Sequence, residues 1–187
     1  MTAFTASVCL FCGARAGHDP RLAEIARETG AMLARENWRL VYGAGDVGLM
    51  GAVAQATQAA GGQTFGVIPQ HLMRREVARR DLSTLVVTET MHERKKVMFT
   101  NSDAIVVLPG GAGTLDEFFE VLTWAQIGLH RKPVFLLDVQ GFWQPLLALI
   151  DHVVEQGFAE PSLRSLFTAA SDIPTLAQVL RSQLATS

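Results

Sequence analysis

The sequence contains little of several features that would indicate particular functions. Its 187 residues include only two cysteines, Cys9 and Cys12, spaced as C-x-x-C. In a strand, residues three positions apart lie on opposite faces, and no second cysteine pair is present in the sequence to complete a zinc site. We therefore expect two buried, reduced thiols and no metal site.

An excess of charge of one sign is also absent. The 16 lysines and arginines nearly balance the 18 aspartates and glutamates, so the formal net charge is −2. A surface that binds nucleic acid needs clustered positive charge. The composition therefore favours a small-molecule partner and no nucleic acid.

No apolar run is long enough to indicate a membrane segment. Residues 1–7 lack a basic segment, and the apolar run Val8 to Cys12 is too short for a signal-peptide core or a membrane span. We expect a cytoplasmic protein with no membrane contact. With 49% hydrophobic residues, the length suits one domain, residues 1–187, with a proper core.

Apolar strand-like runs alternate with helix-like runs along the chain. The expected strands are Ser7 to Cys12, Arg39 to Tyr42, Thr64 to Ile68, Thr84 to Val87, Ala104 to Leu108 and Pro133 to Leu137. The expected helices lie near Pro20 to Glu36, Val47 to Ala60, Glu89 to Asn101, Leu115 to Ile127, Phe142 to Gln156 and Leu176 to Leu184. This alternation predicts an α/β fold with a Rossmann-like parallel sheet and helices on both faces.

The most informative stretch is the glycine-rich run Pro109 to Glu117, between an expected strand and an expected helix. Its glycines Gly110, Gly111 and Gly113 would let the backbone approach a ligand, and the first N–H groups of a helix are ready to bind a phosphate. A second interpretation is a capping box, with Thr114 as N-cap and Glu117 reaching back to it. We favour the anion-binding turn because capping needs no glycine.

Two carboxylates, Asp116 and Glu117, follow the glycines directly. They would repel a phosphate placed beside them, so the anion should lie on the glycine side while the carboxylates face another part of the ligand. A phosphate joined to a sugar fits this division.

A second glycine motif, Gly43-Ala44-Gly45-Asp46-Val47-Gly48, matches the dinucleotide pattern G-x-G-x-x-G. That pattern also needs an acidic residue about 20 positions later, at the end of the next strand. The next strand ends Val67-Ile68-Pro69-Gln70, without an acid. A packing turn and a nucleotide contact are both consistent with the motif, and a bound NAD is less so.

The charged stretch Met91 to Lys96 precedes the strand that leads into the glycine-rich run. Arginine suits bidentate recognition of phosphate or carboxylate, but most charged helical clusters are solvated faces. From the residues alone, both interpretations stay open for Arg94 and Lys95. His92 is more consistent with a structural or solvated role than with catalysis.

Taken together, these stretches resemble the Lonely guy family of cytokinin riboside 5'-monophosphate phosphoribohydrolases, whose members are often mislabelled lysine decarboxylases. The resemblance extends over nearly the whole chain. Its motifs are Met91 to Lys95, Pro109 to Glu117 and Thr123 to Gln126, with landmarks at Phe11 to Gly13, Tyr42 to Gly45, Gly48 to Gly51 and Lys132 to Val134. Two residues depart from the family pattern: Ala44 stands where glycine is frequent, and Asp116 where glutamate is common.

The resemblance implies hydrolysis of the N-glycosidic bond in a nucleotide of the adenosine 5'-monophosphate type, giving a free base and ribose 5-phosphate. It assigns Arg94 and Glu117 as the catalytic pair. The residues that it assigns to substrate binding are Glu76, Lys95, Gly110, Gly111, Gly113, Thr114, Asp116 and Thr123. No cofactor is needed for this reaction.

The chemistry is consistent with these assignments. Cleavage of the bond develops positive charge on the sugar, which a carboxylate such as Glu117 stabilises while it orients or deprotonates the attacking water. Arg94 cannot act as a base, so we assign it to substrate oxygens or to positioning Glu117. Two alternatives are a non-catalytic nucleotide carrier or sensor on the same fold, and a decarboxylase using pyridoxal phosphate on one of only three lysines, Lys95, Lys96 and Lys132.

We also expect a homodimer, as in the shorter members of the family. The predicted helix Leu115 to Ile127 carries too wide an apolar surface for a helix with one solvated side. Its apolar residues are Leu115, Phe118, Phe119, Val121, Leu122, Trp124 and Ile127.

Overall fold

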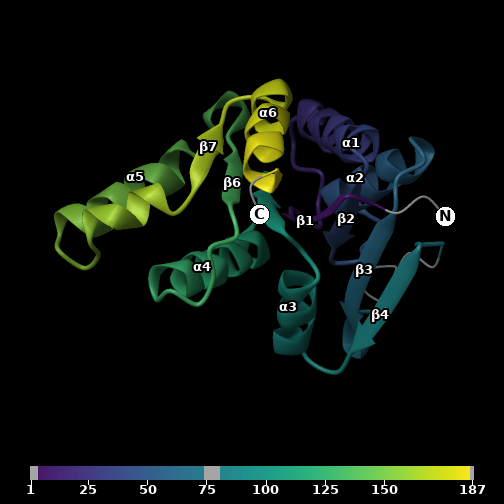
Figure 1. Ribbon diagram of the computed structural model, residues 1–187, viewed down its shortest axis with the longest axis horizontal. Helices are drawn as coiled ribbons and strands as arrows, with labels where there is room; N and C mark the ends of the chain where they lie inside the picture. Colours follow the sequence, from purple (N-terminus) through teal and green to yellow (C-terminus); the bar gives the residue numbers. More distant parts are fainter. Residues whose placement is uncertain (1–3, 74–80, 186–187) are drawn as a thin grey trace.

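A computed structural model describes residues 4–73 and 81–185 (Figure 1). Its strands form one sheet of seven, in the order β4-β3-β2-β1-β5-β6-β7, and every neighbouring pair is parallel. The strands are β1 (Ala6–Phe11), β2 (Trp38–Tyr42), β3 (Thr64–Pro69), β4 (Thr84–Thr88), β5 (Ala104–Val107), β6 (Val134–Leu137) and β7 (Thr168–Ala170). This order confirms the predicted α/β class.

The central strands are apolar because both faces of the sheet are covered. All residues of β1, β5 and β6 are buried. In the register between β1 and β5, Cys9 lies opposite Ile105 and Phe11 opposite Val107. Such two-sided burial explains why these strands read as continuous apolar runs.

The helices form two layers, one on each face of the sheet (Figure 1). One core contains Leu33 of α1, Val53 of α2 and Leu180 of α6. The other contains Met98 of α3, Phe118 of α4 and Ile150 of α5. The helix bounds are α1 (Pro20–Arg35), α2 (Gly48–Ala59), α3 (Met91–Thr100), α4 (Ala112–Gln126), α5 (Gln144–Glu155) and α6 (Ile173–Leu184), with short 3-10 turns η1 (Gln70–Leu72), η2 (Val139–Gly141) and η3 (Pro161–Ser165). None of the helices in the described ranges is long and apolar enough to cross a membrane.

The two cysteines follow the prediction. Cys9 belongs to the core under α3, α4 and α5, and Cys12 to the core on the opposite face. Both are buried and unpaired. Burial, and next the negative charge of Glu117, raise the pKa of each thiol, so neither is a nucleophile at neutral pH.

The structure excludes one alternative and adds one strand. The interpretation of Thr114 and Glu117 as a capping box is wrong, because α4 begins at Ala112 with Gly111 as its N-cap and no side-chain cap. A true capping box instead begins α3, where Thr90 and Glu93 cap each other's backbone N–H groups. The seventh strand, β7, was not predicted, since only one of its three residues is buried.

The strand order reverses direction at β1. The crossover from β1 leads to β2 on one side, whereas β5 pairs with β1 on the other. The loops that follow β1 and β5 therefore diverge and leave a crevice at the carboxyl ends of the strands, the usual ligand position in such sheets.

Candidate active site

A cavity of about 530 Å³ lies at this switch point. The loop after β1 lines it with residues 12–17, and the segment after β5 lines it with Pro109, Gly110, Gly111, Gly113, Thr114, Asp116 and Glu117. Its remaining walls are largely apolar: Leu22, Leu49, Met50, Leu72, Met91 and Phe142, with Arg94 among them. The volume is in the range of small-molecule sites.

The glycine-rich run forms a tight turn into α4. A Cβ atom on Gly110 would lie 2.1 Å from Oγ1 of Thr114, so the turn closes only with glycine there. Thr114 is buried at the third position of the helix. The first N–H groups of α4 lie at the cavity wall, where they can bind an anion.

Arg94 is not part of a solvated face. Its side chain is only 4% exposed, and it donates from Nε to the Val67 carbonyl at 3.1 Å and from Nη2 to the Gly43 carbonyl at 2.7 Å. A Cβ atom on Gly43 would lie 1.9 Å from that Nη2, so the first glycine of the G-x-G-x-x-G motif makes room for the guanidinium. The carbonyls of Gly43, just after β2, and of Val67, within β3, thus hold Arg94 at the cavity.

Lys95 lies beside the site rather than in its wall. Its Nζ contacts Asp116 at 3.0 Å and Glu120 at 3.2 Å and so ties α3 to α4. Burial lowers the pKa of the Lys95 amine, but hydrogen bonds to the two carboxylates outweigh that effect and raise it overall. The raised pKa keeps the Lys95 amine charged, and its contact with Asp116 holds that side chain at the edge of the cavity.

Most of the predicted site residues come together. Arg94, Gly110, Gly111, Gly113, Thr114, Asp116 and Glu117 all line the cavity, and Lys95 touches Asp116. Thr123 lies exposed on α4, about 10 Å along the helix from Asp116 at 1.5 Å per residue, and is not in the cavity wall. Glu76 lies outside the described residues.

Sequence reasoning missed the apolar walls and Arg15. The residues Leu22, Leu49, Met50, Leu72, Met91 and Phe142 come from five separate segments, so only the tertiary fold brings them together. Arg15 did carry a signal, because it follows the expected first strand at the same sheet edge as the glycine-rich run.

The second glycine motif packs closely against a neighbouring loop of the site. Gly48 has φ +63°, and a Cβ atom there would lie 2.4 Å from the Ala14 carbonyl, so this position needs glycine for both reasons. Ala44 also has a positive φ, 58°, which favours the glycine that the family often has there. The motif therefore packs the β2–α2 turn against the β1 loop.

The lysines bear on pyridoxal phosphate chemistry, which requires a Schiff base with a lysine. None of the three lysines lines the cavity. Lys95 is paired with Asp116 and Glu120, and Lys132 donates to the carbonyls of Phe99 and Ser102. The residues present therefore do not fit pyridoxal phosphate. Within residues 4–73 and 81–185, no three His, Cys, Asp or Glu side chains gather as metal ligands would.

The fold and the cavity define a Rossmann-like protein that places a buried arginine and a carboxylate beside a glycine-rich turn at its switch point. The family described as possible lysine decarboxylase matches residues 50–180. Two cytokinin riboside 5'-monophosphate phosphoribohydrolases of Arabidopsis thaliana are each 43% identical over 173 residues, covering 92% of this chain and 81% and 76% of theirs. The chain belongs to this family of phosphoribohydrolases, the Lonely guy family.

Among solved structures, the molybdenum cofactor carrier protein of Chlamydomonas reinhardtii is similar, with a TM-score of 0.74 and 21% identity, covering 97% of this chain and 99% of that one. The molybdenum cofactor binding protein of Rippkaea orientalis has a TM-score of 0.72 at 22% identity, covering 95% and 96% of the two chains. At such identities the likeness shows the fold alone.

Proposed function

We propose that the protein hydrolyses the N-glycosidic bond of cytokinin-type adenosine 5'-monophosphates to a free base and ribose 5-phosphate. The observation that carries this proposal is that Arg94 and Glu117 line the same cavity as the Gly110 to Thr114 turn. The names of the Arabidopsis relatives support the same reaction.

In this reaction the bond between C1' of the ribose and the base nitrogen breaks, and the oxygen of a water molecule bonds to C1'. Positive charge develops on the sugar in the transition state, and the Glu117 carboxylate stabilises it and takes a proton from the water. The departing base nitrogen takes up a proton, so that the elements of water are added across the broken bond. The carbonyls of Gly43 and Val67 hold Arg94 in a fixed orientation. Its guanidinium can therefore bind substrate oxygens without reorganising.

The 5'-phosphate would bind at the start of α4. The helix begins with Ala112, Gly113 and Thr114, and its N-cap residue Gly111 supplies no side-chain acceptor. An anion there would accept hydrogen bonds from these first N–H groups and gain from the helix dipole. Lys95 would act on the nucleotide through Asp116, which it holds at 3.0 Å.

The apolar walls favour a base with an apolar substituent. Leu22, Leu72, Met91 and Phe142 line the cavity and offer no charged partner to an amine. An N6-prenyl group on adenine would bury apolar surface against them, at about 25 cal/mol per Å². We therefore infer that N6-substituted nucleotides are better substrates than plain AMP.

We further propose that the chain acts as one domain and as a cytoplasmic homodimer. The seven strands of the described residues share one sheet, and both cysteines are unpaired, as is usual in reducing compartments. On α4, Phe119 is 38% exposed and Ile127 63% exposed, and Thr123 lies between them on the same side of the helix. A contact between subunits through this side would cover both apolar residues and bring Thr123 to the interface.

The experiment is to incubate the purified protein with AMP, N6-isopentenyl-AMP, and the two nucleosides that lack the phosphate, and to measure the free base. We expect base release from both nucleotides, faster from the N6-substituted one, and much slower release from the nucleosides, because remote binding energy positions the reacting bond. Recovery of every nucleotide intact after saturable binding would support a carrier or sensor instead. Equal turnover of nucleotide and nucleoside would contradict the phosphate site.

A further inference from the structure

One charged residue in the cavity wall has no part in the proposed mechanism: Arg15, on the loop after β1. Its side chain is exposed, and in the part of the chain that the structure describes it forms neither an ion pair nor a hydrogen bond. Two exposed arginines of α1 are paired: Arg21 with Asp19 at 2.9 Å and Arg27 with Glu24 at 2.7 Å. Arg15 is therefore a cation available to a ligand.

The backbone that carries Arg15 is held firmly at the cavity. Gly13 donates from its N–H to the Pro109 carbonyl at 3.0 Å, and its own carbonyl accepts from the Leu49 N–H at 3.1 Å. Gly48 packs so closely against this loop that a Cβ atom there would lie 2.6 Å from the backbone nitrogen of Arg15. These contacts join the loop to both the glycine-rich segment and the start of α2.

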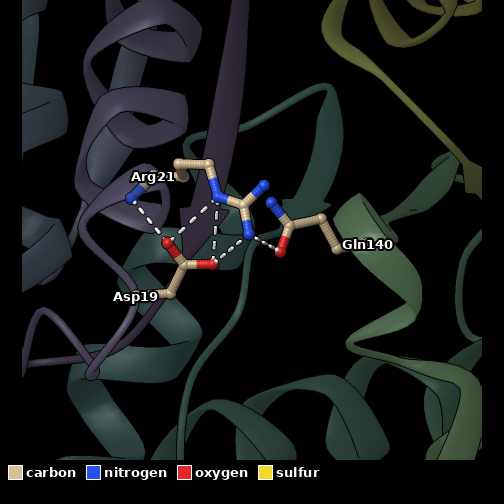
Figure 2. A network of polar contacts seen from close by, with 3 residues as sticks. All are labelled: Asp19, Arg21 and Gln140. Carbon is tan, nitrogen blue, oxygen red and sulfur yellow. Dashed lines mark hydrogen bonds and ion pairs between the residues drawn. The ribbon is translucent and has the colours of Figure 1, made fainter.

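The far end of the loop is held as well, as Figure 2 shows. Asp19 caps α1 by accepting from the Arg21 N–H at 3.0 Å, and it also binds the Arg21 guanidinium. Arg21 in turn donates from Nη2 to Oε1 of Gln140 at 3.1 Å, which ties the loop to η2 beside the cavity residue Phe142. With both ends of the loop fixed, Arg15 stays at the cavity wall.

A phosphate bound in the cavity would be stabilised by such a cation. Among the described residues, the charged ones that line the cavity are Arg15, Arg94, Asp116 and Glu117, whose formal charges cancel. Arg94 already donates to two carbonyls, so part of its donor capacity is used. A phosphate monoester brings about 1.5 to 2 negative charges at neutral pH. It would gain most from the Arg15 guanidinium, which forms no ion pair or hydrogen bond with the described residues.

We propose that Arg15 binds the substrate's 5'-phosphate, opposite the N–H groups at the start of α4. The assignment rests on the proposed function for the identity of the substrate, and it makes Arg15 a determinant of the preference for nucleotides over nucleosides. The guanidinium fork suits two phosphate oxygens, whereas a lysine in its place would supply the charge without the paired geometry.

The test is to compare Arg15→Ala and Arg15→Lys with the wild-type protein, using N6-isopentenyl-AMP and its nucleoside as substrates. Arg15→Ala should lower kcat/KM for the nucleotide by about tenfold to hundredfold, the range of a charged hydrogen bond, and leave the nucleoside rate unchanged. Arg15→Lys should recover part of the loss. Arg27→Ala, which removes a positive charge from α1 away from the cavity, should match the wild type with both substrates.

Binding of ribose 5-phosphate, measured by calorimetry, separates this proposal from the proposed function. If the wild type turns over no nucleotide, the hydrolase proposal fails, but weaker binding of ribose 5-phosphate to Arg15→Ala still supports the phosphate contact. Unchanged binding and unchanged nucleotide kinetics in Arg15→Ala would overturn the inference. An equal loss with nucleotide and nucleoside would also overturn it, because the effect would not depend on the phosphate.

Discussion

At the scale of single residues, the glycines of the turn have different roles. Gly110 is needed by the fold, because a Cβ atom there would collide with Thr114. Gly113 also lines the cavity, but within the described residues nothing lies within 4 Å of the place its Cβ atom would occupy. The open space beside Gly113 therefore leaves room for a ligand to approach the start of α4.

We predict that Gly113→Ala separates binding from stability. The variant should be as stable as the wild type, or more stable by at most about 1 kcal/mol, because alanine favours a helix more than glycine does. The added methyl group should still lower kcat/KM for the nucleotide by about tenfold or more, since it blocks close approach of the phosphate to the helix start. Thermal melts and steady-state kinetics measure the two effects. Normal kinetics in a folded Gly113→Ala protein would argue against a phosphate at this turn.

Single-residue contacts across the sheet were beyond the reach of sequence reasoning. The motif at Gly43 predicted either packing or a nucleotide, whereas its first glycine accommodates the buried Arg94 from α3. No spacing rule relates residues 51 positions apart. Arg94 could be proposed from the family resemblance, but its anchoring by Gly43 and Val67 could not.

At the scale of secondary-structure elements, the local patterns located most strands and helices but misplaced the start of α4. Thr114 and Glu117 have the spacing of a capping box, yet Thr114 is buried against Gly110, inside a helix that begins at Ala112. The tertiary packing of the turn overrides the local capping preference. The sequence pattern does not predict the edge strand β7, because two of its three residues are exposed.

The contact between α1 and α6 predicts a pH-dependent stability. Glu36, at the end of α1, accepts two hydrogen bonds from the guanidinium of Arg181 on α6. The Nε atom of Arg181 lies 2.8 Å from Oε2 of Glu36, and its Nη2 binds Oε1. The hydrogen bond to Arg181 lowers the pKa of the Glu36 carboxyl from its ordinary value of 4.5, against the opposing effect of burial. A lowered pKa in the folded state stabilises the protein above pH 4.5, and the gain is lost as the pH falls through the lowered value.

Glu36→Gln should therefore melt about 1–3 °C below the wild type at pH 7, a difference typical of a partly exposed ion pair. The two melting temperatures should converge as the pH is lowered below 4.5. Melting curves between pH 7 and pH 3 measure this, and a difference that persists unchanged at pH 3 would count against the pair as its source.

At the scale of the whole molecule, the exposed side of α4 predicts a dimer. Light scattering of the wild type at micromolar concentration should give about twice the chain mass of 20.3 kDa. Ile127→Asp should give the single-chain mass, because a charge within an apolar interface is costly to bury. Val87→Asp, which alters an exposed residue of β4 instead, should remain dimeric. A monomeric wild type would contradict the dimer.

The architecture of the molecule could be predicted from the sequence because alternating apolar strands and helices allow few arrangements. The glycine turn and Glu117 could be placed at the carboxyl edge of the sheet on the same grounds, whereas the site role of Arg94 came from the family resemblance. The walls of the cavity could not, since Leu22, Leu72 and Phe142 come from distant segments with no shared pattern. The ion pairs of Lys95 with Asp116 and Glu120 could not be predicted either, because they depend on how α3 packs beside α4.

Glu117→Gln tests the central claim most directly. The substitution keeps the size of the side chain but removes the negative charge that would stabilise the cationic sugar and accept a proton from water. We predict that its melting temperature stays within a few degrees of the wild type and that base release from N6-isopentenyl-AMP falls by about a hundredfold or more. Glu155→Gln, at the exposed end of α5, serves as the matched control and should react normally. Near-normal base release by Glu117→Gln would contradict the account, and the catalytic carboxylate would then have to be sought at Asp116 or Glu120.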